Sequence, residues 1–253
     1  MLLEDAAKSA PAIMHSGKEY ICLMELHGDV SDEELEDALQ LFTGEIYQVP
    51  PVRSSVARRP RIRVIYGSRI VERDGRHVLL EVACSAGTYM RKLCHDIGEY
   101  LGIGAHMEEL RRIRAGPFIE QESASLLDVY SAWKTYREEG DDRELRRVVR
   151  PVEECVKLLP KVYVLDTAVD AVCHGADLAV VGIARVESGI KEGDLTAIMT
   201  LKGELVALGT SMMSSEQMLE ATEGIAIDTT RVIMERQTYP SIWKGGLRKR
   251  PNT

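Results

Sequence analysis

The sequence predicts an α+β protein built from a mixed-sheet domain over residues 1–159 and a small β-pseudobarrel over 160–236, followed by a basic tail over 237–253. Before Pro160, strand-like runs alternate with segments of helical periodicity. After Pro160, short β-runs follow one another closely, with turns such as GIKEGD and LKGE between them. Short strands separated by regular turns are typical of a small barrel. We therefore place a domain boundary near Pro160.

Local signals define the elements of the first part. Ser31 and Glu34 have the spacing of a capping box, and Asp74-Gly75 is a strong hairpin signal. Thr88 is expected to cap a helix whose apolar residues recur at helical spacing up to Leu101. In chain order, the predicted elements are a strand over 18–27, a helix over 31–44, strands over 61–72 and 77–84, helices over 88–101 and 123–139, and short helices over 141–159.

The second part is predicted from its short β-runs. These are VYVL, LAVVGIARV, LTAIMTL, ELVALGTSMM and GIAIDTTRVIM, and one helical signal, Ser215–Ala221, interrupts them. The longest apolar runs are far too short to span a membrane. The start, MLLEDAAKSAP, has acids where a signal peptide needs basic and then apolar residues. No membrane association is predicted.

The five cysteines include no C-x-x-C pair, and an odd number does not suit a disulfide framework. We interpret them as buried thiols in a reducing compartment, which predicts a cytoplasmic location. The histidines show no metal-ligand spacing, so no metal site is predicted. P-loop, G-x-G-x-x-G, H-E-x-x-H and G-x-S-x-G motifs are also absent from the sequence.

The net charge of −8 argues against RNA binding by bulk attraction, but the basic residues are unevenly distributed. One run without acids contains Arg53, Arg58, Arg59, Arg61 and Arg63, and the segment after Arg236 is also basic. A phosphate-binding surface needs only local positive density, so Arg58 and Arg59 are candidate RNA contacts. A solvated surface and a loose basic tail explain these runs equally well.

The block from Cys84 to Gly116 carries the remaining candidates. It leaves a strand through a turn of small residues and enters a helix, which places Tyr89 and Arg91 near the junction of the two. The pattern alone favours an ordinary loop with a surface arginine.

Several motifs of the sequence resemble one known family, in the expected order. SAGTYMRKLCHDIGEYLG followed by AHMEELRRIRAG resembles the arginine-bearing motif of the TruB/dyskerin family of RNA pseudouridine synthases, and KEY at Lys18–Tyr20 resembles its tyrosine-bearing strand. CHGADLAVVGI, IKEGD, TLKGE and VALG look like a PUA domain, the RNA-binding module usual in this family. RVIMERQTYPSIW is similar to the tail of the archaeal and eukaryotic guide-RNA branch.

The resemblance implies an isomerase that converts uridine to pseudouridine in ribosomal RNA, guided by box H/ACA RNA and assisted by small H/ACA particle proteins. The reaction breaks the glycosidic bond, turns the base and rejoins it through carbon, so no cofactor is implied. A guide-independent synthase acting on the T-loop of tRNA is an alternative. A non-catalytic RNA-binding protein of the PUA type is another.

The resemblance also implies roles for single residues. Arg91 matches the arginine that pairs with the catalytic aspartate, a role suited to a guanidinium because it stays charged when shielded from water. Tyr20 matches the tyrosine that stacks on the flipped-out base. Tyr89 and Leu110 match further positions that bind the substrate, although packing in the core would explain them equally well.

RNA contacts in the second part are expected from two turns. The first contains Gly175, Ala176 and Asp177, and the second contains Lys202 and Gly203. Because the region around them is acidic, we expect contacts directed by shape and by base edges, helped by the basic tail, in place of broad phosphate attraction.

The sequence departs from the family at the catalytic aspartate. The aspartate belongs to a G-T-L-D-P-type motif upstream of the tyrosine strand, and no such motif occurs here. Because MLLEDAAKSAP resembles the stretch just after that motif, the N-terminal part is expected to be missing. A polypeptide of these residues is therefore expected to bind RNA without forming pseudouridine, and to dissolve poorly because an apolar edge is exposed.

Overall fold

A computed structural model describes residues 1–50, 57 and 59–241. The chain forms two compact units, which we treat separately. Met14–Val149 is the strand-helix unit, and Arg150–Thr253 together with Met1–Ile13 is the barrel unit. Within the described ranges, no helix is long and apolar enough to cross a membrane. The predicted α+β class is confirmed, and the predicted boundaries of 1–159, 160–236 and 237–253 remain predictions.

The strand-helix unit is built on a six-stranded sheet in the order β2-β3-β4-β1-β5-β6. Its strands are β1 (Lys18–Leu26), β2 (Gly44–Gln48), β3 (Arg61–Asp74), β4 (His77–Cys84), β5 (Ala105–Ala115) and β6 (Phe118–Ile119). Each adjacent pair of these strands is antiparallel. The predicted hairpin at Asp74-Gly75 joins β3 to β4, and the positive φ of Gly75, 58°, suits a turn glycine.

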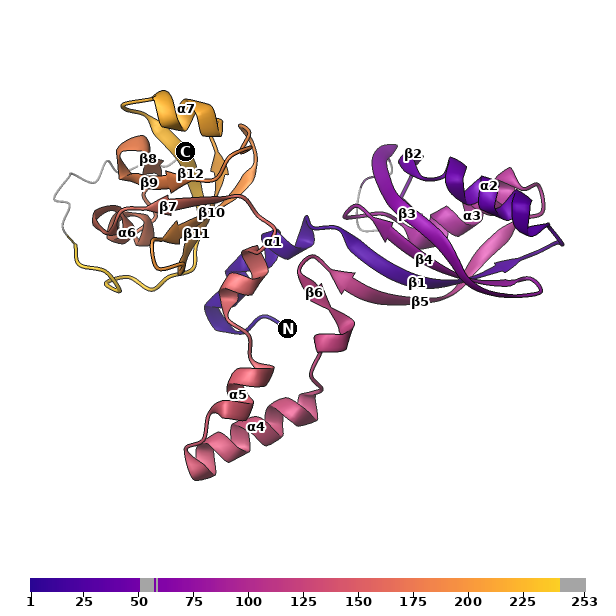
Figure 1. The fold of residues 1–253 in the computed structure, drawn as a ribbon, viewed down its shortest axis with the longest axis horizontal. Helices are drawn as coiled ribbons and strands as arrows, with labels where there is room; N and C mark the ends of the chain where they lie inside the picture. Colours follow the sequence, from indigo (N-terminus) through magenta and orange to yellow (C-terminus); the bar gives the residue numbers. More distant parts are fainter. Residues whose placement is uncertain (51–56, 58, 242–253) are drawn as a thin grey trace. The chain divides into compact units, whose positions relative to one another are not determined.

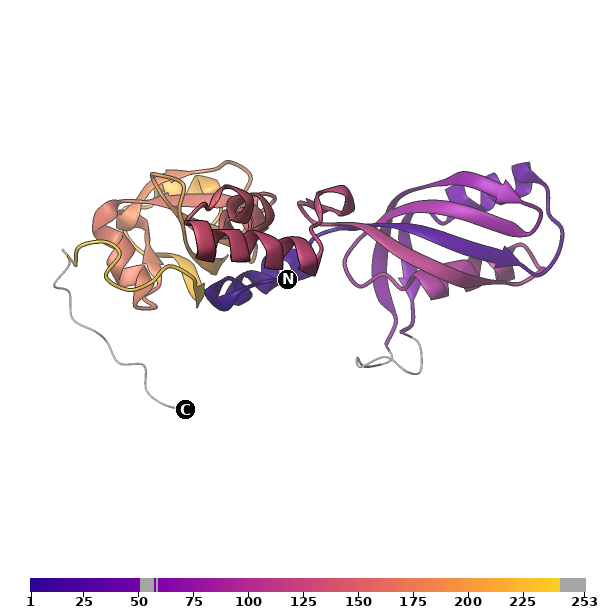
Figure 2. The ribbon, with the colours of Figure 1, turned by 90° about the horizontal axis from the view of Figure 1, so that it is seen from below.

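Two helices cover one face of this sheet, α2 (Asp32–Leu41) and α3 (Met90–Tyr100), as Figure 1 shows. Along β1, Cys22, Met24 and Leu26 are fully buried in the core that these helices cover. The alternate side chains point to the opposite face because strand periodicity is two residues. Figure 2 views the sheet from below, with its strands side by side. The capping box of Ser31 and Glu34 is confirmed at the start of α2.

Strand β5 is absent from the predicted elements. Its sequence, AHMEELRRIRA, is rich in residues that favour helices, yet it pairs along the whole of β1. Close packing with α3 accompanies this pairing: a Cβ at Gly98 would lie 2.0 Å from the backbone nitrogen of Ala105. Pairing with β1 satisfies backbone groups that would otherwise be left open, and this outweighs local propensity.

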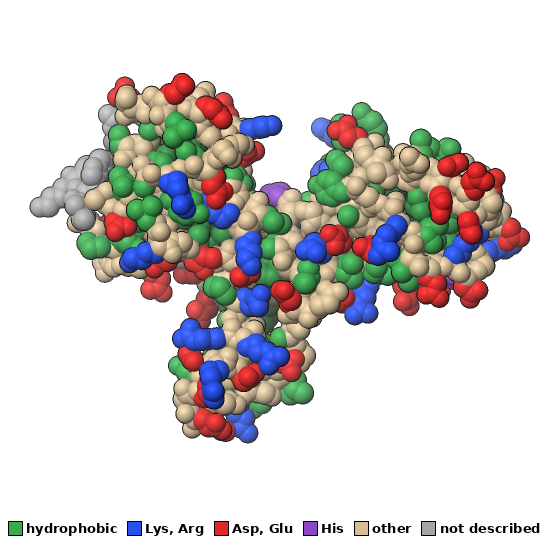
Figure 3. Space-filling view, viewed as in Figure 1, with side chains coloured by type: hydrophobic (Ala, Val, Ile, Leu, Met, Phe, Trp, Pro, Cys, Tyr) green, Lys and Arg blue, Asp and Glu red, His purple; other side chains and the backbone are tan. Residues whose placement is uncertain are grey.

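Two helices follow the sheet, α4 (Leu126–Glu139) and α5 (Arg143–Val148), after a short 3-10 turn, η2 (Glu120–Glu122). The predicted helix over 123–139 is confirmed, and Ser125 caps it in a capping box with Asp128. Its large apolar side chains are exposed in this structure: Leu126, Leu127, Tyr130, Trp133 and Tyr136. Figure 3 shows basic side chains gathered over α5.

The barrel unit contains the second six-stranded sheet, in the order β8-β12-β11-β10-β7-β9. Its strands are β7 (Lys161–Val164), β8 (Leu178–Ala179), β9 (Ile183–Val186), β10 (Leu195–Thr200), β11 (Leu205–Ser211) and β12 (Ile225–Val232). Its helical segments are η1 (Glu4–Ser9), α1 (Ala10–Met14), η3 (Val152–Val156), α6 (Asp166–Cys173), η4 (Val180–Gly182) and α7 (Ser215–Glu220). Because β7 and β10 are parallel, the sheet of the barrel unit is mixed, whereas the sheet of the strand-helix unit is antiparallel throughout.

The connection between β8 and β9 explains why this sheet curls. These strands are at opposite edges of the sheet, and a flat sheet of this width would separate them by about 24 Å. Only the three residues Val180–Gly182 join them, and four Cα–Cα steps reach about 15 Å at most. The sheet therefore bends its edges together around a core that includes Val162, Ile198 and Ile227. This is the predicted pseudobarrel.

Candidate functional site

The turn between β4 and α3, Ser85–Tyr89, is held by hydrogen bonds to β3 and within itself. We call it the junction. The Ser85 backbone N–H donates to the Val64 carbonyl (2.8 Å), and the Val64 N–H donates to Ser85 Oγ (2.9 Å). The Thr88 hydroxyl donates to the Ser85 carbonyl (2.9 Å). Strand pairing is thereby continued past the end of β4.

Arg63 fastens the middle of the junction. Its Nε donates to the Gly87 carbonyl (3.0 Å), and Gly87 has a φ of +76°, a conformation that other residues rarely adopt. A Cβ at Gly87 would lie 3.1 Å from the Arg63 guanidinium. One member of the predicted basic run therefore has a structural role in this turn.

Gln48 forms hydrogen bonds with both backbone groups of Tyr89, the last residue of the junction. Its Oε1 accepts the Tyr89 backbone N–H (2.9 Å), and its Nε2 donates to the Tyr89 carbonyl (3.2 Å). The side chain is almost fully buried, at 1% exposure. The predicted cap at Thr88 is wrong: α3 starts one residue later, after Tyr89, and the Thr88 hydroxyl is directed to Ser85. Gln48 thus fixes the backbone from which α3 begins.

Arg91 lies in the first turn of α3 and is exposed. That turn contains no acidic residue, and within the described ranges Arg91 forms no ion pair. The N-terminal end of a helix favours negative charge by roughly 0.3–1 kcal/mol and disfavours a lone cation. The position therefore suits an arginine that meets an anionic partner.

Tyr20 lies in β1 between Val82 of β4 and Arg112 of β5. It is half-buried, and burial raises the pKa of its phenol, with a hydrogen bond from Arg112 acting in the opposite direction. The phenol is therefore uncharged near neutral pH. A neutral aromatic ring is suited to stacking on a base.

Tyr89 and Leu110 lie on elements that contact β1, the strand of Tyr20. Tyr89 is half-buried at the start of α3, and Leu110 is 41% exposed on β5, opposite Cys22. Residues two apart on a strand share a face, so Leu110 shares a face with Tyr20. Helix α3 packs against both β1 and β5. The four predicted residues of the site thus come from three elements in mutual contact, and their roles remain predictions.

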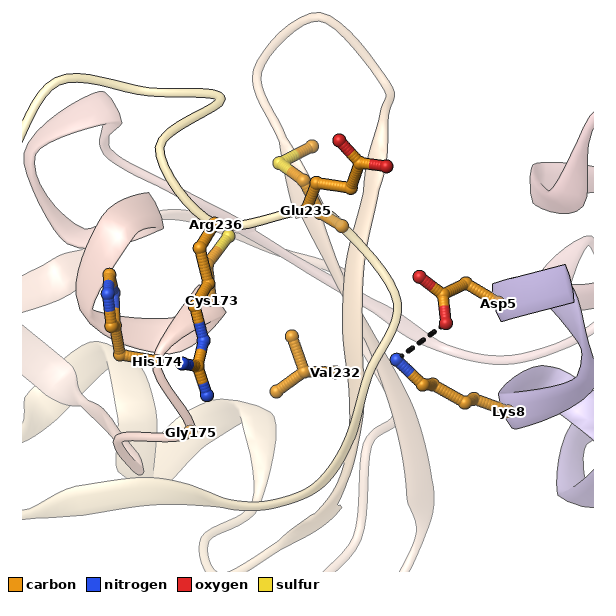
Figure 4. Close-up of a pocket in the computed structure, with 9 residues that line it drawn as sticks. Asp5, Lys8, Cys173, His174, Gly175, Val232, Glu235 and Arg236 are labelled. Atoms are coloured by element: carbon orange, nitrogen blue, oxygen red, sulfur yellow. Dashed lines mark ion pairs between the residues drawn. The ribbon is translucent and has the colours of Figure 1, made fainter.

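A pocket of about 470 Å³ opens beside the first predicted RNA-binding turn in the barrel unit. Figure 4 shows Cys173, His174 and Arg236 on one side of it, and Asp5 and Lys8, joined by an ion pair of 2.8 Å, on the other. Burial raises the pKa of Cys173 to about 11, so this thiol is uncharged at neutral pH. The charged lining of the pocket is therefore mixed, with Arg236 next to Glu235 and Lys8 paired with Asp5.

The turn itself is tied to β12. Gly175 and Ala176 are exposed, and Gly175 has a φ of +86°. Asp177 Oδ1 accepts the Thr229 N–H (3.1 Å), and the Thr229 hydroxyl donates to the Ala176 carbonyl (3.0 Å). The Gly175 and Ala176 N–H groups donate to the carbonyls of Val172 (2.8 Å) and Ala171 (3.0 Å), so the turn is tied to α6 as well as to β12 and offers an exposed surface of fixed shape.

The second predicted turn, Lys202–Gly203, connects β10 to β11 and does not line this pocket. Lys202 Nζ lies 5.1 Å from the ring centroid of Tyr239, and the Tyr239 hydroxyl donates to Glu204 Oε2 (2.6 Å). A hydrogen bond with Tyr239 raises the pKa of Lys202. Arg59 is exposed, whereas Arg58 lies outside the described residues.

Gln48, Arg63 and Tyr239 were missed by the sequence reasoning as residues that support these sites. Tyr239 is 7% exposed and packs in the core of the barrel unit. No periodicity or motif marks a residue whose function is to hold a distant backbone segment. The two prolines at positions 50 and 51 exclude a continuing helix after Gln48 and do not mark Gln48 as a support.

Three family models match successive parts of the chain. They describe a TruB family pseudouridylate synthase (N terminal domain) at residues 1–90, a tRNA pseudouridylate synthase B C-terminal domain at 91–157, and a PUA domain at 160–233. These matches do not support the expectation of a missing first segment.

Curated relatives and solved structures match nearly the whole chain. The chain is 56% identical over 241 residues to a "Probable tRNA pseudouridine synthase B" of Methanopyrus kandleri; the match covers 95% of this chain and 71% of the relative. The "Probable tRNA pseudouridine synthase B" of Pyrococcus furiosus is 51% identical over 246 residues, which cover 96% of this chain and 72% of the relative. A structure entitled "Crystal Structure of a Cbf5-Nop10-Gar1 Complex" matches with a TM-score of 0.90 and 51% identity, covering 94% of this chain and 73% of that one.

A second solved structure extends the comparison to RNA. It is entitled "Structure of H/ACA RNP bound to a substrate RNA containing 2'-deoxyuridine". It matches with a TM-score of 0.86 and 48% identity, over 95% of this chain and 73% of that one.

Proposed function

Because the chain belongs to the TruB family of pseudouridylate synthases, we propose that it is the synthase subunit of an H/ACA-type particle. In this particle it isomerises uridine to pseudouridine in ribosomal RNA that a box H/ACA guide selects. Small proteins such as the Nop10 and Gar1 of the solved complex are its partners. A cytoplasmic location completes the proposal, in line with five free and buried cysteines.

The observation that carries the proposal is the placement of Arg91. It stands exposed at the positive end of α3, without an acidic partner within the described ranges, on a backbone that Gln48 and Arg63 hold in place. An arginine so placed suits a carboxylate that it holds ionised and oriented by a bidentate contact. A carboxylate so held is the group that acts on the nucleotide.

Tyr20, Tyr89 and Leu110 form the surface that receives the base. The Tyr20 ring replaces the stacking that uracil loses when it leaves the RNA helix, an interaction that contributes about 1–3 kcal/mol. During the reaction the bond from C1′ to N1 of uracil breaks, the base turns, and C1′ bonds to C5; the hydrogen on C5 then leaves as a proton and N1 takes up a proton, so the atoms balance without a cofactor. The site residues contribute binding, orientation and the exclusion of water.

The barrel unit binds the guide. The exposed turn of Gly175, Ala176 and Asp177 offers a surface of fixed shape for base-directed contacts, and Lys202 with Gly203 offers a second turn. Arg59 and its neighbour Arg58 supply further phosphate contacts. Most of the specificity is expected from shape, because acidic residues are numerous in this unit.

Two alternatives have observations of their own. The relatives are named for tRNA, which favours a guide-independent synthase acting on tRNA. The absence of a G-T-L-D-P-type motif from the sequence favours an RNA-binding protein without catalysis. The guide-dependent function remains the better choice, since two solved complexes with TM-scores of 0.86 and 0.90 match almost the entire chain.

A binding and turnover experiment tests the proposal. The 253-residue chain is mixed with a box H/ACA guide and its ribosomal target, or with an unmodified tRNA, and both binding and pseudouridine are measured. We expect guide binding to be tighter than tRNA binding, and no turnover, because the sequence lacks the aspartate motif. Joining a segment that bears G-T-L-D-P to the chain should produce guide-dependent turnover, which Arg91→Lys should reduce.

The outcomes separate the three functions. Preference for tRNA would indicate the guide-independent enzyme. Guide binding with no turnover after the aspartate segment is joined would indicate a non-catalytic protein. Turnover by the 253-residue chain alone would contradict the roles given to Arg91 and its partner.

A further inference from the structure

The face of the strand-helix sheet opposite α2 and α3 carries histidines and glutamates in a row across three strands. Glu25 of β1 pairs with His77 of β4 on one side and with His106 of β5 on the other. Directly paired residues share a face, so these three side chains emerge together. Glu108, two residues after His106, emerges on the same side. Strand register thus gathers ligands that lie far apart in the sequence.

The distances within this row suit a single ion. One ligand atom each of Glu25, His77 and Glu108 lies within 4.8 Å of the other two. His77 Nε2 lies 3.6 Å from Glu108 Oε2, and His106 Nε2 lies 3.6 Å from Glu25 Oε2. Ligands bound tetrahedrally at about 2.0–2.2 Å from a zinc ion are about 3.3–3.6 Å apart. His106 is not a member of this group of three, so its ring has to turn toward the ion to become a fourth ligand.

His27 orients the neighbouring histidine. Its Nε2 lies 2.8 Å from His106 Nδ1, and this hydrogen bond occupies the ring nitrogen that faces away from Glu25. Metal-binding histidines usually have their second ring nitrogen hydrogen-bonded in this way, which fixes both the ring and its tautomer. The pair is a second feature of a metal site, independent of the glutamates.

We propose that Glu25, His77 and Glu108 bind a divalent zinc-like ion, with His106 as the fourth ligand and His27 as its positioning residue. Imidazole with carboxylate favours Zn²⁺ and its first-row neighbours over Mg²⁺ or Ca²⁺, which prefer oxygen alone. The five cysteines are buried, so thiolate is not offered on this surface. A bound ion would cross-link the neighbouring strands β4, β1 and β5. The spacing of histidines in the sequence could not predict this site, because its ligands come from three strands.

Metal titration of the 253-residue chain tests the proposal. The chain, freed of metal by a chelator, is titrated with Zn²⁺ by calorimetry and with Co²⁺ by visible absorption. We expect one ion per chain, a four-coordinate cobalt spectrum without thiolate bands, and a higher unfolding temperature with Zn²⁺. His77→Ala and Glu108→Gln should each abolish this binding. His27→Ala should weaken it about 10–100-fold and leave the unfolding temperature of the metal-free chain unchanged.

His95→Ala is the matched control, because His95 is exposed on α3, the helix on the covered face of the sheet. It should leave metal binding unchanged. Binding that survives His77→Ala, a cobalt spectrum with thiolate bands, or no binding at millimolar Zn²⁺ would each overturn the proposal. In the last case the row is only a set of histidine–carboxylate ion pairs. None of these results depends on pseudouridine formation, so the proposed function is tested separately.

Discussion

The junction and the Gly175–Asp177 turn are both glycine-containing turns beside a helix, but they are held in different ways. The junction is held by Gln48, a buried side chain that grips both backbone groups of Tyr89. The turn is held to β12 by its own half-exposed Asp177, which accepts the Thr229 N–H, and by the Thr229 hydroxyl, which donates to the Ala176 carbonyl. Water can replace Asp177 as a hydrogen-bond partner because that side chain is half-exposed, but it cannot reach the buried side chain of Gln48.

The difference matches what each turn presents. The junction places the side chains of Tyr89 and Arg91, and a catalytic side chain must be held within a fraction of an ångström. The turn presents the exposed residues Gly175 and Ala176, and recognition of RNA by shape tolerates small adjustments. We therefore expect a buried support at the proposed chemical site and an exposed support at the proposed recognition site.

Removing the buried support should have the largest effect. Gln48→Ala leaves the Tyr89 N–H without its acceptor and takes one donor from the Tyr89 carbonyl, which still accepts the Lys92 and Leu93 N–H groups; with the lost side-chain volume, this is expected to lower the free energy of unfolding by about 2–4 kcal/mol. Gln48→Glu keeps the volume and should cost more at neutral pH than in acid, because a buried carboxylate cannot donate to the Tyr89 carbonyl and a protonated carboxyl can. Urea denaturation measures both variants. The control Gln40→Ala, at an exposed position of α2, should stay within about 0.5 kcal/mol of the parent.

Equal stability of Gln48→Ala and Gln40→Ala would show that the two hydrogen bonds between Gln48 and Tyr89 do not stabilise the junction. If Gln48→Ala is unfolded, Gln48→Glu measured across pH decides the question, since it keeps the volume and can restore both hydrogen bonds only when its carboxyl is protonated. In the chain joined to an aspartate segment, both Gln48 variants should reduce turnover more than they reduce guide binding.

A smaller effect is expected at the exposed support. Asp177→Ala removes the acceptor of the Thr229 N–H, and water can replace it, so the loss of stability should be about 0.5–1.5 kcal/mol. Guide-RNA affinity should fall as the turn loosens, whereas the control Glu192→Ala, on an exposed neighbouring turn, should not change it. Unchanged RNA affinity for Asp177→Ala would remove this turn from the interface.

The sequence predicted what local signals determine. The hairpin at Asp74-Gly75, the capping box of Ser31, and helix α3 arise from neighbouring residues, and all three are confirmed. The α+β class and the pseudobarrel follow from the same signals summed along the chain.

Non-local features escaped prediction. β5 is a strand because the edge of β1 requires a partner, against the preference of its own residues. Gln48 supports Tyr89 from 41 residues away, and the row of Glu25 and His77 exists only through strand register. The roles of Tyr20 and Arg91 were suggested by resemblance and remain predictions, because the contacts that would define them involve RNA.

The smallest expected effect lies at the second turn. Lys202 is exposed and lies over Tyr239, next to Glu204, so its charge is partly balanced by an acid and its contact with a phosphate should be weak. Lys202→Ala should therefore reduce the salt dependence of guide binding by at most about one unit of slope. Affinity measured against salt concentration for the full chain, with Lys191→Ala as the exposed control, tests this. If the salt dependence of guide binding is steep and becomes shallow in Lys202→Ala, attraction between Lys202 and phosphates dominates at this turn. The second turn would then not recognise RNA by shape, contrary to the expectation from the comparison of the two turns.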